Sequence, residues 1–532
     1  MVEISGELRE DQIVPFHQLQ QQLRERWRTE VELEQDDCDI LVLPSFSLDQ
    51  QVGKKVAGFL HYEERLLFSL IRLRNPRTRL VYVTGQPLAP MIVEYYFQLL
   101  SGIPFSHARD RLLLLTTYDN SFKPLTQKIL ERPRLIERIR RALRPGKSYI
   151  VCFNATAMEA ELSLRLNVPL FASSPALAYW GSKSGSRAIF AEVKIPHPDG
   201  SPLVNTVAAL KTELVALWQR QPHLDRLVIK LNEGFSGEGN VVVPLDPQLT
   251  ETEAQRLYLE SIFPTLNFPA AGETWASFSG RIPDLGAIAE AFVSGEESRS
   301  PSVQGYITPA GDVSILSTHD QILGGPDQQV YLGCRFPADA AYRLPLQTLG
   351  LKVGQALAKR GAMERFGVDF MAVRHGQTWD LSAIEINLRK GGTTHPFMTL
   401  KLLTNGWYDE EQGLFFSQNG QPKFYLASDN LQKPAYQGLL PNDLMDIIAT
   451  HHLHYDSSTQ TGTLFHLMGA LSEFGKLGLT SIGSSPQEAQ AIYDNVTASL
   501  DLESQGSPVR NFSLSHQARW IEQFPPDQEI LP

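Results

Sequence analysis

Cysteine, long apolar runs and excess positive charge are all scarce in this sequence. Its three cysteines, Cys38, Cys152 and Cys334, lie far apart and are odd in number, which argues against a disulfide framework and favours a reducing compartment. No apolar run approaches the roughly 20 residues of a membrane helix, and the charged start MVEISGELREDQ lacks the apolar segment of a secretory signal. A net charge of -11 opposes diffuse binding to nucleic acid or to anionic membranes. These absences favour a cytoplasmic enzyme with small-molecule partners.

The usual signatures of several enzyme classes are also missing. GKS at Gly146 to Ser148 lacks the upstream glycine of a P-loop, and the sequence contains no GxGxxG, HExxH, CxxC or GxSxG pattern. P-loop nucleotide hydrolysis, Rossmann-type hydride transfer, zinc proteolysis and serine hydrolysis therefore lose their sequence support.

The first third of the chain has the pattern of an open α/β sheet. At 532 residues the chain is too long for one hydrophobic core, so several domains are expected. Between residues 37 and 177, buried strands alternate with helices, which implies parallel pairing in a doubly wound sheet. Residues 1–36 are expected to form an irregular N-terminal extension. The expected strands are DCDILVLPSF, TRLVYVTG, RLLLLTT and SYIVCFNAT, and the expected helices are His61–Arg74, Met91–Gly102, Pro133–Leu143 and Ala157–Asn167.

The remainder of the chain changes character at about residue 178. RLVIKLNEGFSGEGNVVVPL and SPSVQGYITPAGDVSILS have the pattern of β-hairpins, which predicts an α+β domain over residues 178–403. Residues 404–532 are predicted to form a C-terminal α+β domain that packs on this core, with helices at Pro441–His451 and Pro486–Ala498.

Two lysines are candidate phosphate ligands. Lys230 ends a buried strand and precedes a glycine-rich loop that contains Ser236, Gly237 and Gly239. Glycines let backbone N–H groups approach phosphate oxygens, and a lysine adds a point charge. Lys183 is a second candidate. The alternatives are a plain flexible hairpin and a solvated loop lysine.

The segment AEAFVSGEESRS turns from an apolar strand into paired glutamates. Its backbone at Ala291–Val293 can hydrogen-bond an adenine ring, and Glu297 can accept hydrogen bonds from ribose hydroxyls. The alternative is a strand end followed by a solvated acidic turn.

Two further strands carry candidate metal ligands. Asp369 is the only charge in FGVDF, and a buried carboxylate is costly unless it is paired or bound to a cation. In IEINLRKGGTTHP the side chains of Glu385, Asn387 and Arg389 share one face of a strand. Oxygen ligands from Asp369, Glu385 and Asn387 suit Mg2+ or Mn2+. A direct Glu385–Arg389 pair is disfavoured, because four residues of strand separate them by about 13 Å.

A last group of polar residues is a weaker candidate for a substrate site. His319, Asp320 and Gln321 in STHDQILGG, together with Arg335, can line such a site. Ordinary surface-loop chemistry explains these residues nearly as well.

Taken in chain order, these motifs resemble the ATP-grasp superfamily of carboxylate-amine ligases. The resemblance spans Tyr179 to Pro396, and the preceding α/β segment is similar to the pre-ATP-grasp domain of that superfamily. More narrowly, the chain resembles the peptide ligase of pheganomycin biosynthesis and its relatives. The segments that carry this likeness are YEERLL, KSGSRAIF, STHDQILGGP, GCRFPA, EINLRKGGTTHP and GALSEFGKLGLTSIG.

The resemblance implies a nucleotide site. Lys183 and Lys230 would contact the phosphates of ATP, Glu290 and Val293 would meet adenine, and Glu297 would meet ribose. The mobile loop that closes over the phosphates would contain Ser236, Gly237 and Gly239.

It also implies a metal and reaction centre. Asp369, Glu385 and Asn387 would bind Mg2+, or Mn2+, and Arg389 would steady the phosphorylated intermediate, with Lys230 also acting on the reacting phosphate. The chain departs from the pattern at Ala291, where many members have lysine, so adenine recognition there would rest on backbone groups.

The implied activity is ATP-dependent amide formation through an acyl phosphate, with release of ADP and phosphate. The expected partners are small-molecule or short-peptide acid and amine substrates, without nucleic acid or membrane, and homo-oligomerisation stays open. Two alternatives remain at this point: a small-molecule kinase on the same ATP site, and a non-catalytic nucleotide-binding scaffold.

Overall fold

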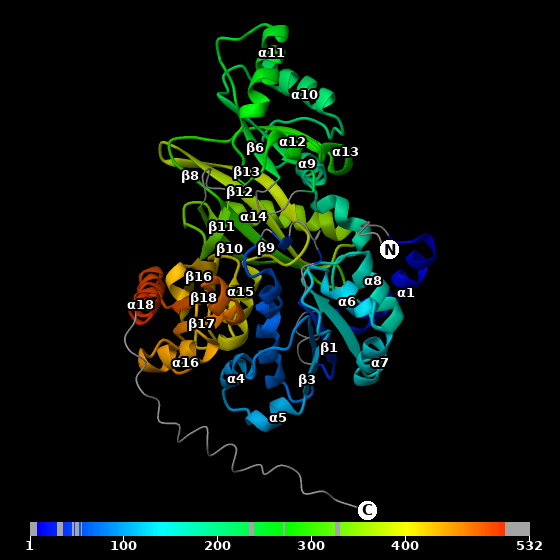
Figure 1. Ribbon diagram of the computed structural model, residues 1–532, viewed down its shortest axis with the longest axis vertical. Helices are drawn as coiled ribbons and strands as arrows, with labels where there is room; N and C mark the ends of the chain where they lie inside the picture. The colour runs from blue at the N-terminus through cyan, green and yellow to red at the C-terminus, as the bar shows by residue number, and fades with distance from the viewer. Residues whose placement is uncertain are drawn as a thin grey trace, which may run out of the picture.

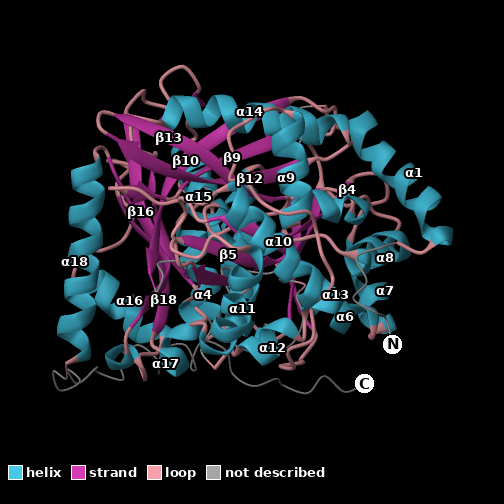
Figure 2. Cartoon of the chain, turned by 90° about the horizontal axis from the view of Figure 1, so that it is seen from above, coloured by secondary structure: helices cyan, strands magenta, loops and turns pink. Residues whose placement is uncertain are grey.

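The computed structural model describes residues 8–28, 36–44, 47, 53–54, 56–233, 239–269, 272–324 and 330–505. Its strands form a four-stranded, a three-stranded and an eleven-stranded sheet. Figure 1 shows the three-stranded sheet with its helices at the top and the four-stranded sheet below it on the right. The last helix and the first lie at opposite sides of the molecule in both Figure 1 and Figure 2.

The four-stranded sheet is parallel, with the order β3-β2-β1-β4. Alternate residues of β1 pack into two different cores: Ile40 and Val42 into one, Leu41 and Leu43 into the other. Both faces are therefore covered, as in a doubly wound sheet, and the predicted fold class is confirmed. The elements are β1 (Asp39–Leu43), η1 (Phe59–Arg74, with 3-10 geometry), β2 (Arg79–Thr84), α4 (Pro90–Gln98), α5 (Phe105–Arg109), β3 (Leu112–Thr116), α6 (Leu125–Leu130), α7 (Pro133–Ala142), β4 (Ser148–Cys152) and α8 (Ala157–Leu166).

The expectation of an irregular N-terminal start is wrong, because residues Glu10–Arg26 form helix α1. Phe16 and Leu23 are fully buried, and α1 packs against α8. The side-chain amide of Gln20 donates to the Leu170 carbonyl at 2.6 Å and accepts from the Leu170 N–H at 2.8 Å. Tertiary contacts thus stabilise a helix whose polar sequence, interrupted by Pro15, gives little local signal.

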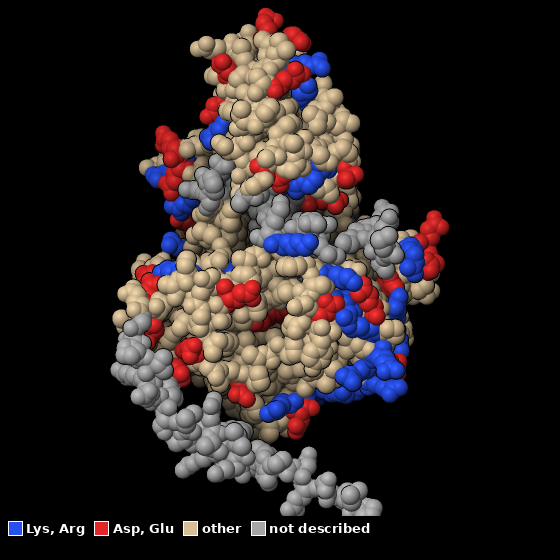
Figure 3. Space-filling view, in the orientation of Figure 1, with Lys and Arg blue, Asp and Glu red and all other residues tan. Residues whose placement is uncertain are grey.

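Helix α7 illustrates how the surface of this unit is charged. Ile136 and Ile139 are buried, while its arginines face outward. Figure 3 shows Lys and Arg side chains gathered low on the right, where Figure 1 places α7. Glu137 pairs with both Arg140 and Arg141, so part of this positive charge is balanced locally.

The three-stranded sheet is antiparallel, with the order β6-β5-β7, and helices cover its core-facing side. Its strands are β5 (Arg226–Leu231), β6 (Asn240–Pro244) and β7 (Ala287–Ala291). The helices of this part of the chain are η2 (Pro175–Gly181), α9 (Lys183–Glu192), α10 (Val207–Arg220), α11 (Thr252–Ile262), η3 (Phe263–Thr265), α12 (Trp275–Ser279) and α13 (Ile282–Leu285).

The eleven-stranded sheet joins the middle and the end of the chain. Its main path is β13-β12-β9-β10-β11-β16-β15-β14, and the link is the antiparallel pairing of β11 with β16 through Cys334 and Ala427. Its strands are β8 (Ser298–Arg299), β9 (Pro301–Ile307), β10 (Val313–Gly324), β11 (Val330–Phe336), β12 (Glu364–His375), β13 (Thr378–Asn387), β14 (Trp407–Asp409), β15 (Leu414–Phe416), β16 (Pro422–Gln432), β17 (Gly462–His466) and β18 (Lys476–Gly483). The accompanying helices are α14 (Arg343–Lys359), α15 (Thr394–Thr404), η4 (Pro434–Tyr436), α16 (Pro441–Thr450), η5 (Met468–Ala470), α17 (Leu471–Phe474) and α18 (Pro486–Ser504).

The hairpins and C-terminal helices predicted from the sequence are confirmed as β5–β6, β9–β10, α16 and α18. The boundaries at residues 37, 178 and 404 stay predictions. All three cysteines are buried and unbridged. Among the described residues, no helix combines the length and apolar character needed to span a bilayer.

Candidate active site

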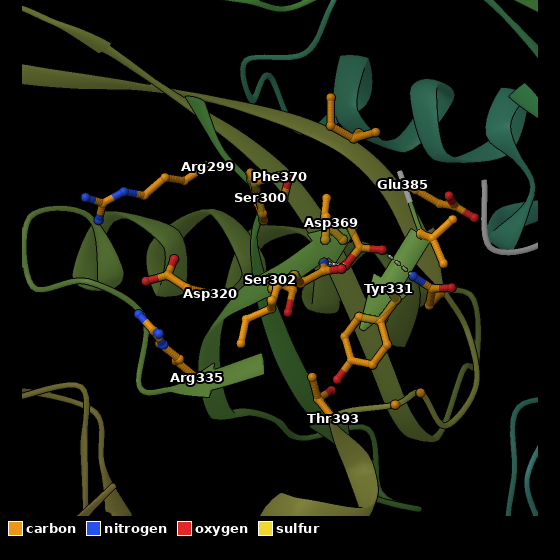
Figure 4. Close-up of a pocket in the computed structure, with 18 of the residues that line it drawn as sticks. Arg299, Ser300, Ser302, Asp320, Tyr331, Arg335, Asp369, Phe370, Glu385 and Thr393 are labelled. Atoms are coloured by element: carbon orange, nitrogen blue, oxygen red, sulfur yellow. Dashed lines mark hydrogen bonds between the residues drawn. The ribbon is translucent and has the colours of Figure 1, made fainter. Parts of the chain in front are cut away.

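A cavity of about 1540 Å³ is lined by residues of both the three-stranded and the eleven-stranded sheet. Residues of η1 and of the C-terminal strands β16 and β18 complete its wall. Figure 4 shows Asp369 and Glu385 near the centre and right of this cavity, with Arg299, Asp320 and Arg335 grouped on the left. The volume exceeds that of typical single-ligand sites, so the cavity has room for more than one small molecule.

Strand pairing brings the predicted metal ligands together. Asp369 on β12 lies opposite Glu385 on β13, and Gly367 lies opposite Asn387. The register shifts just after Asp369, and such an irregularity re-aims side chains near a site. Asp369 accepts hydrogen bonds from Asn387 Nδ2 at 2.7 Å and from Gln321 Nε2 at 2.8 Å.

The electrostatics of this group favour a cation. Burial, followed by the charge of Glu385, raises the pKa of Asp369 to about 6, although Asn387 and Arg389 act in the opposite direction. Burial lowers the pKa of Arg389 from its ordinary value. A divalent ion relieves the repulsion between two carboxylates that lie opposite each other on paired strands.

The donor set of Asp369, Glu385 and Asn387 fits Mg2+. Within the described residues, no group of three or more His, Cys, Asp and Glu side chains is arranged to hold a metal. Two carboxylates and one amide would therefore leave several ligand positions to water and phosphate oxygens, which is how Mg2+ is usually bound beside nucleotides.

Lys183 lies next to these candidate metal ligands. It is the first residue of α9, only 5% exposed, and its Nζ donates to Glu385 Oε1 at 2.8 Å. Helix α9 is held against β13 because the Ile386 N–H donates to Ser186 Oγ at 3.0 Å. Gly185 lets the start of α9 lie close to η2, since a Cβ there would lie 1.9 Å from the Tyr179 carbonyl oxygen.

Lys230 belongs to a second buried charge group. Its Nζ donates to Glu290 Oε2 at 2.5 Å, and Arg187 Nη1 donates to Glu290 Oε1 at 3.0 Å. Glu290 is 1% exposed. Burial acts to raise the pKa of Glu290, but Lys230 and Arg187 outweigh it and hold that pKa below its usual range. Sequence reasoning missed Arg187, although its position four residues after Lys183 on α9 places both on one helix face.

Of the residues predicted to contact the nucleoside, the adenine pair lines the cavity and the ribose residue does not. Glu290 and Val293 line the cavity. Glu297 is not among the lining residues, and instead it pairs with Arg299 at 2.7 Å and Arg374 at 3.0 Å. Its ribose role stays a prediction.

The predicted phosphate loop is only partly described. The Gly239 carbonyl accepts from the Leu231 N–H at 2.7 Å, which closes the β5–β6 turn. Ser236 and Gly237 lie outside the described residues.

Three of the four weaker candidates also line the cavity, namely Asp320, Gln321 and Arg335. His319 does not: it is fully buried, with Nε2 2.5 Å from the Tyr425 hydroxyl, and burial lowers its pKa to about 3. His319 therefore belongs to the core beneath the site.

Comparison with known proteins gives matches along most of the chain. Residues 265–410 match the family model described as "IQCH-like, ATP-grasp", and residues 443–496 match "PGM1 C-terminal domain". The L-propargylglycine–L-glutamate ligase of Streptantibioticus cattleyicolor is 30% identical over 458 residues, which cover 84% of this chain and 91% of that protein. The IQ motif-containing protein H of Danio rerio is 22% identical over 435 residues, 74% of this chain but 41% of that longer protein.

Solved structures share the fold. The biotin carboxylase domain of Hydrogenobacter thermophilus 2-oxoglutarate carboxylase aligns with a TM-score of 0.52 at 12% identity, over 86% of this chain and 89% of that one. An N5-carboxyaminoimidazole ribonucleotide synthetase in complex with ADP aligns with a TM-score of 0.50 at 10% identity, over 88% and 97%. The ligase relative, the ATP-grasp model and the shared architecture lead to one conclusion: this chain belongs to the ATP-grasp ligases.

Proposed function

We propose that this ligase joins the carboxylate of one amino acid or short peptide to the amine of another, with ATP converted to ADP and phosphate. The substrate class is suggested by the relative whose name gives L-propargylglycine and L-glutamate. The observation that carries the proposal is the convergence of Lys230, Asp369, Glu385, Asn387 and Arg389 on one cavity of about 1540 Å³. We place this reaction in the cytoplasm.

The chemistry requires a better leaving group than oxide. A carboxylate oxygen attacks the γ-phosphorus of ATP, the bond to ADP breaks, and an acyl phosphate forms. The amine then attacks the acyl carbon, phosphate leaves, and the nitrogen loses a proton. Asp369, Glu385 and Asn387 would hold Mg2+, which would supply positive charge to offset that of the phosphate groups.

The remaining residues would bind and orient the reactants. In this structure Lys230 donates to the carboxylate of Glu290, and Lys183 donates to that of Glu385. A bound triphosphate would offer each ammonium a more highly charged partner. Arg389, two residues beyond Asn387, would hold the charge of the reacting acyl phosphate. Substrates that fill the cavity would displace water, which would strengthen these interactions and protect the intermediate from hydrolysis.

Oxygen-18 transfer tests the acyl-phosphate route. With the acid substrate labelled in its carboxylate, one labelled oxygen should appear in inorganic phosphate for each amide formed, as measured by mass spectrometry. Release of ADP should be much slower when the amine is omitted.

Other results identify the alternatives. Amide formation without label transfer would contradict the acyl-phosphate mechanism. A stable phosphoester as the product would identify a small-molecule kinase, and no ATP turnover across a broad panel of acids and amines would identify a non-catalytic nucleotide-binding protein.

A further inference from the structure

One end of the cavity carries charges that the ATP chemistry does not use. Tyr62 and Arg65 from η1, Asp429 from β16 and Lys476 from β18 all line the wall there, and we name these four residues the head-group cluster. Asp429 lies where the pairing of β16 with β18 is interrupted, between Ser428 and Leu431. An irregularity of this kind turns a side chain out of the regular alternation, here into a cavity.

The cluster is held in a defined geometry. Arg65 Nη2 donates to Asp429 Oδ2 at 2.5 Å, and the Arg65 guanidinium lies 3.8 Å from the centre of the Tyr62 ring. Lys476 Nζ donates to the Tyr62 hydroxyl at 2.8 Å and to the Ala57 carbonyl at 3.4 Å. Three secondary-structure elements thus fix two cations and one carboxylate around a single aromatic ring.

The charges of the cluster do not balance. Arg65 is paired with Asp429, whereas both hydrogen-bond acceptors of Lys476 are neutral although Lys476 is only 4% exposed. Among the residues that the structure describes, no carboxylate pairs directly with this ammonium. A nearly buried ammonium in that setting is costly, and the cost is relieved when an anion binds beside it. Because Lys476 lines the cavity, a ligand can supply that anion.

The cluster is adjacent to the reaction centre. Gly391 and Gly392, which directly follow Arg389 and Lys390, line the large cavity. The same two glycines share a second cavity, of about 10 Å³, with Arg65 and Asp429. A small molecule held at the cluster therefore lies next to the segment that leaves the metal-binding strand.

We propose that the head-group cluster binds one amino-acid substrate by its α-carboxylate, at Lys476 and Arg65, and by its α-ammonium, at Asp429. This inference rests on the proposed function, because it assigns one of the two substrates of that ligase to a place in the cavity. With both α groups held there, that substrate would react through a carboxylate or amine of its side chain. Two cations beside one carboxylate match the opposite charges of an amino-acid head group, and Tyr62 fixes the spacing between them.

Equilibrium binding tests the proposal without requiring turnover. Each standard L-amino acid is titrated into the full-length protein with ADP and Mg2+ and followed by calorimetry, and at least one should bind. Its α-amide, which lacks the carboxylate charge, and its N-acetyl form, which lacks the ammonium, should both bind more weakly. Lys476→Gln should weaken binding of the amino acid about 10- to 100-fold, as expected for loss of a charge-assisted hydrogen bond.

Lys423 provides a matched control. It is a fully buried lysine on β16 whose Nζ also has neutral partners, the Thr459 carbonyl and Ser484 Oγ at 3.1 Å, but it does not line the cavity. Lys423→Gln should leave amino-acid affinity unchanged even if it lowers stability. Unchanged ADP affinity in Lys476→Gln shows that this variant is folded.

A pH titration gives a second readout. Burial lowers the pKa of Lys476 to about 8, with Asp429 opposing and Arg65 reinforcing the shift, and burial keeps the neighbouring Tyr62 hydroxyl protonated by raising its pKa. Since the carboxylate needs the charged ammonium, amino-acid affinity should fall as the pH rises above about 8. Lys476→Arg should retain binding and move the fall in affinity to the higher pH at which the α-ammonium of the amino acid itself loses its proton, because arginine stays charged.

The outcomes separate this inference from the proposed function. Equal affinity in wild type and Lys476→Gln, or no binding of any amino acid to the wild type, would overturn the inference. Amino-acid binding that depends on Lys476, combined with no amide product from any substrate pair, would support the cluster and reject the proposed function.

Discussion

Replacing Glu385 by glutamine should lower the rate of ADP formation by about 10²- to 10³-fold, the usual effect of removing one electrostatic contact to the transition state. The substitution keeps the volume of the side chain and removes the charge that faces Asp369 across β12 and β13. Mg2+ would then lose one of two carboxylate ligands. The apparent Mg2+ requirement, measured as ADP release over a range of Mg2+ concentrations, should rise in the same variant.

The matched control for this variant is Asp380→Asn. Asp380 lies on the same strand, β13, but its side chain is 74% exposed and its partner is His375, at 3.7 Å. We expect normal turnover from this variant. Normal turnover from Glu385→Gln at every Mg2+ concentration would show that Glu385 does not bind the metal.

The fold should survive the loss of the Glu385 charge. Lys183 donates to Glu385 Oε1, and the glutamine amide still offers an oxygen at that position. The hydrogen bond from the Ile386 N–H to Ser186 Oγ also remains, so α9 stays attached to β13. Thermal unfolding therefore separates a catalytic effect from a structural one, because only a structural effect lowers the melting temperature along with activity.

The sequence predicts those parts of the fold whose signal is local. Parallel strands alternating with helices repeat over a few dozen residues each, so the four-stranded sheet and its order of elements are evident from periodicity. Helix α1 has no such signal, since it is stabilised by contacts that are distant in the sequence, such as the hydrogen bonds between Gln20 and Leu170, 150 residues apart. The pairing of β11 with β16 is equally distant, and for that reason the sequence does not predict that the middle and the end of the chain share one sheet.

In the candidate site, too, local patterns can be predicted from the sequence and long-range contacts cannot. Glu385 and Asn387 alternate along β13, so their common face can be predicted from alternation alone. The prediction that Arg389 continues this strand is wrong, because β13 ends at Asn387. Arg187 and the head-group cluster depend on elements that meet only in the folded chain, such as η1 against β16 and β18. Glu297 shows the converse case: its position in the motif favours ribose, while the fold places Arg299 and Arg374 beside it.

Replacing Lys230 by glutamine should raise the KM for ATP about 10- to 100-fold, the effect of losing a charged hydrogen-bond donor to phosphate. It should also lower the maximal rate, because Lys230 is expected to act on the reacting phosphate. Steady-state kinetics with ATP as the varied substrate measure both parameters. The control is Lys211→Gln on α10, a helix packed beside the three-stranded sheet. Lys211 pairs with the exposed Glu260 and does not line the cavity, so this variant should behave as wild type.

The dependence of folding stability on pH tests whether the charge of Lys230 stabilises the protein through its ion pair with Glu290. The folded pKa of Glu290 lies below its ordinary value of 4.5, so its ion pairs contribute stability that is fully present above that value and is lost as the pH falls through the folded pKa. Removing the Lys230 charge should lower stability near neutral pH by about 1–3 kcal/mol, with Arg187 still paired to Glu290. The difference between variant and wild type should shrink as the pH falls below 4.5 and through the folded pKa of Glu290, because the carboxyl group then becomes protonated in both. A difference that stayed constant from neutral pH to acid would mean that Lys230 stabilises the fold by packing, and its charge would then be unengaged before ATP binds.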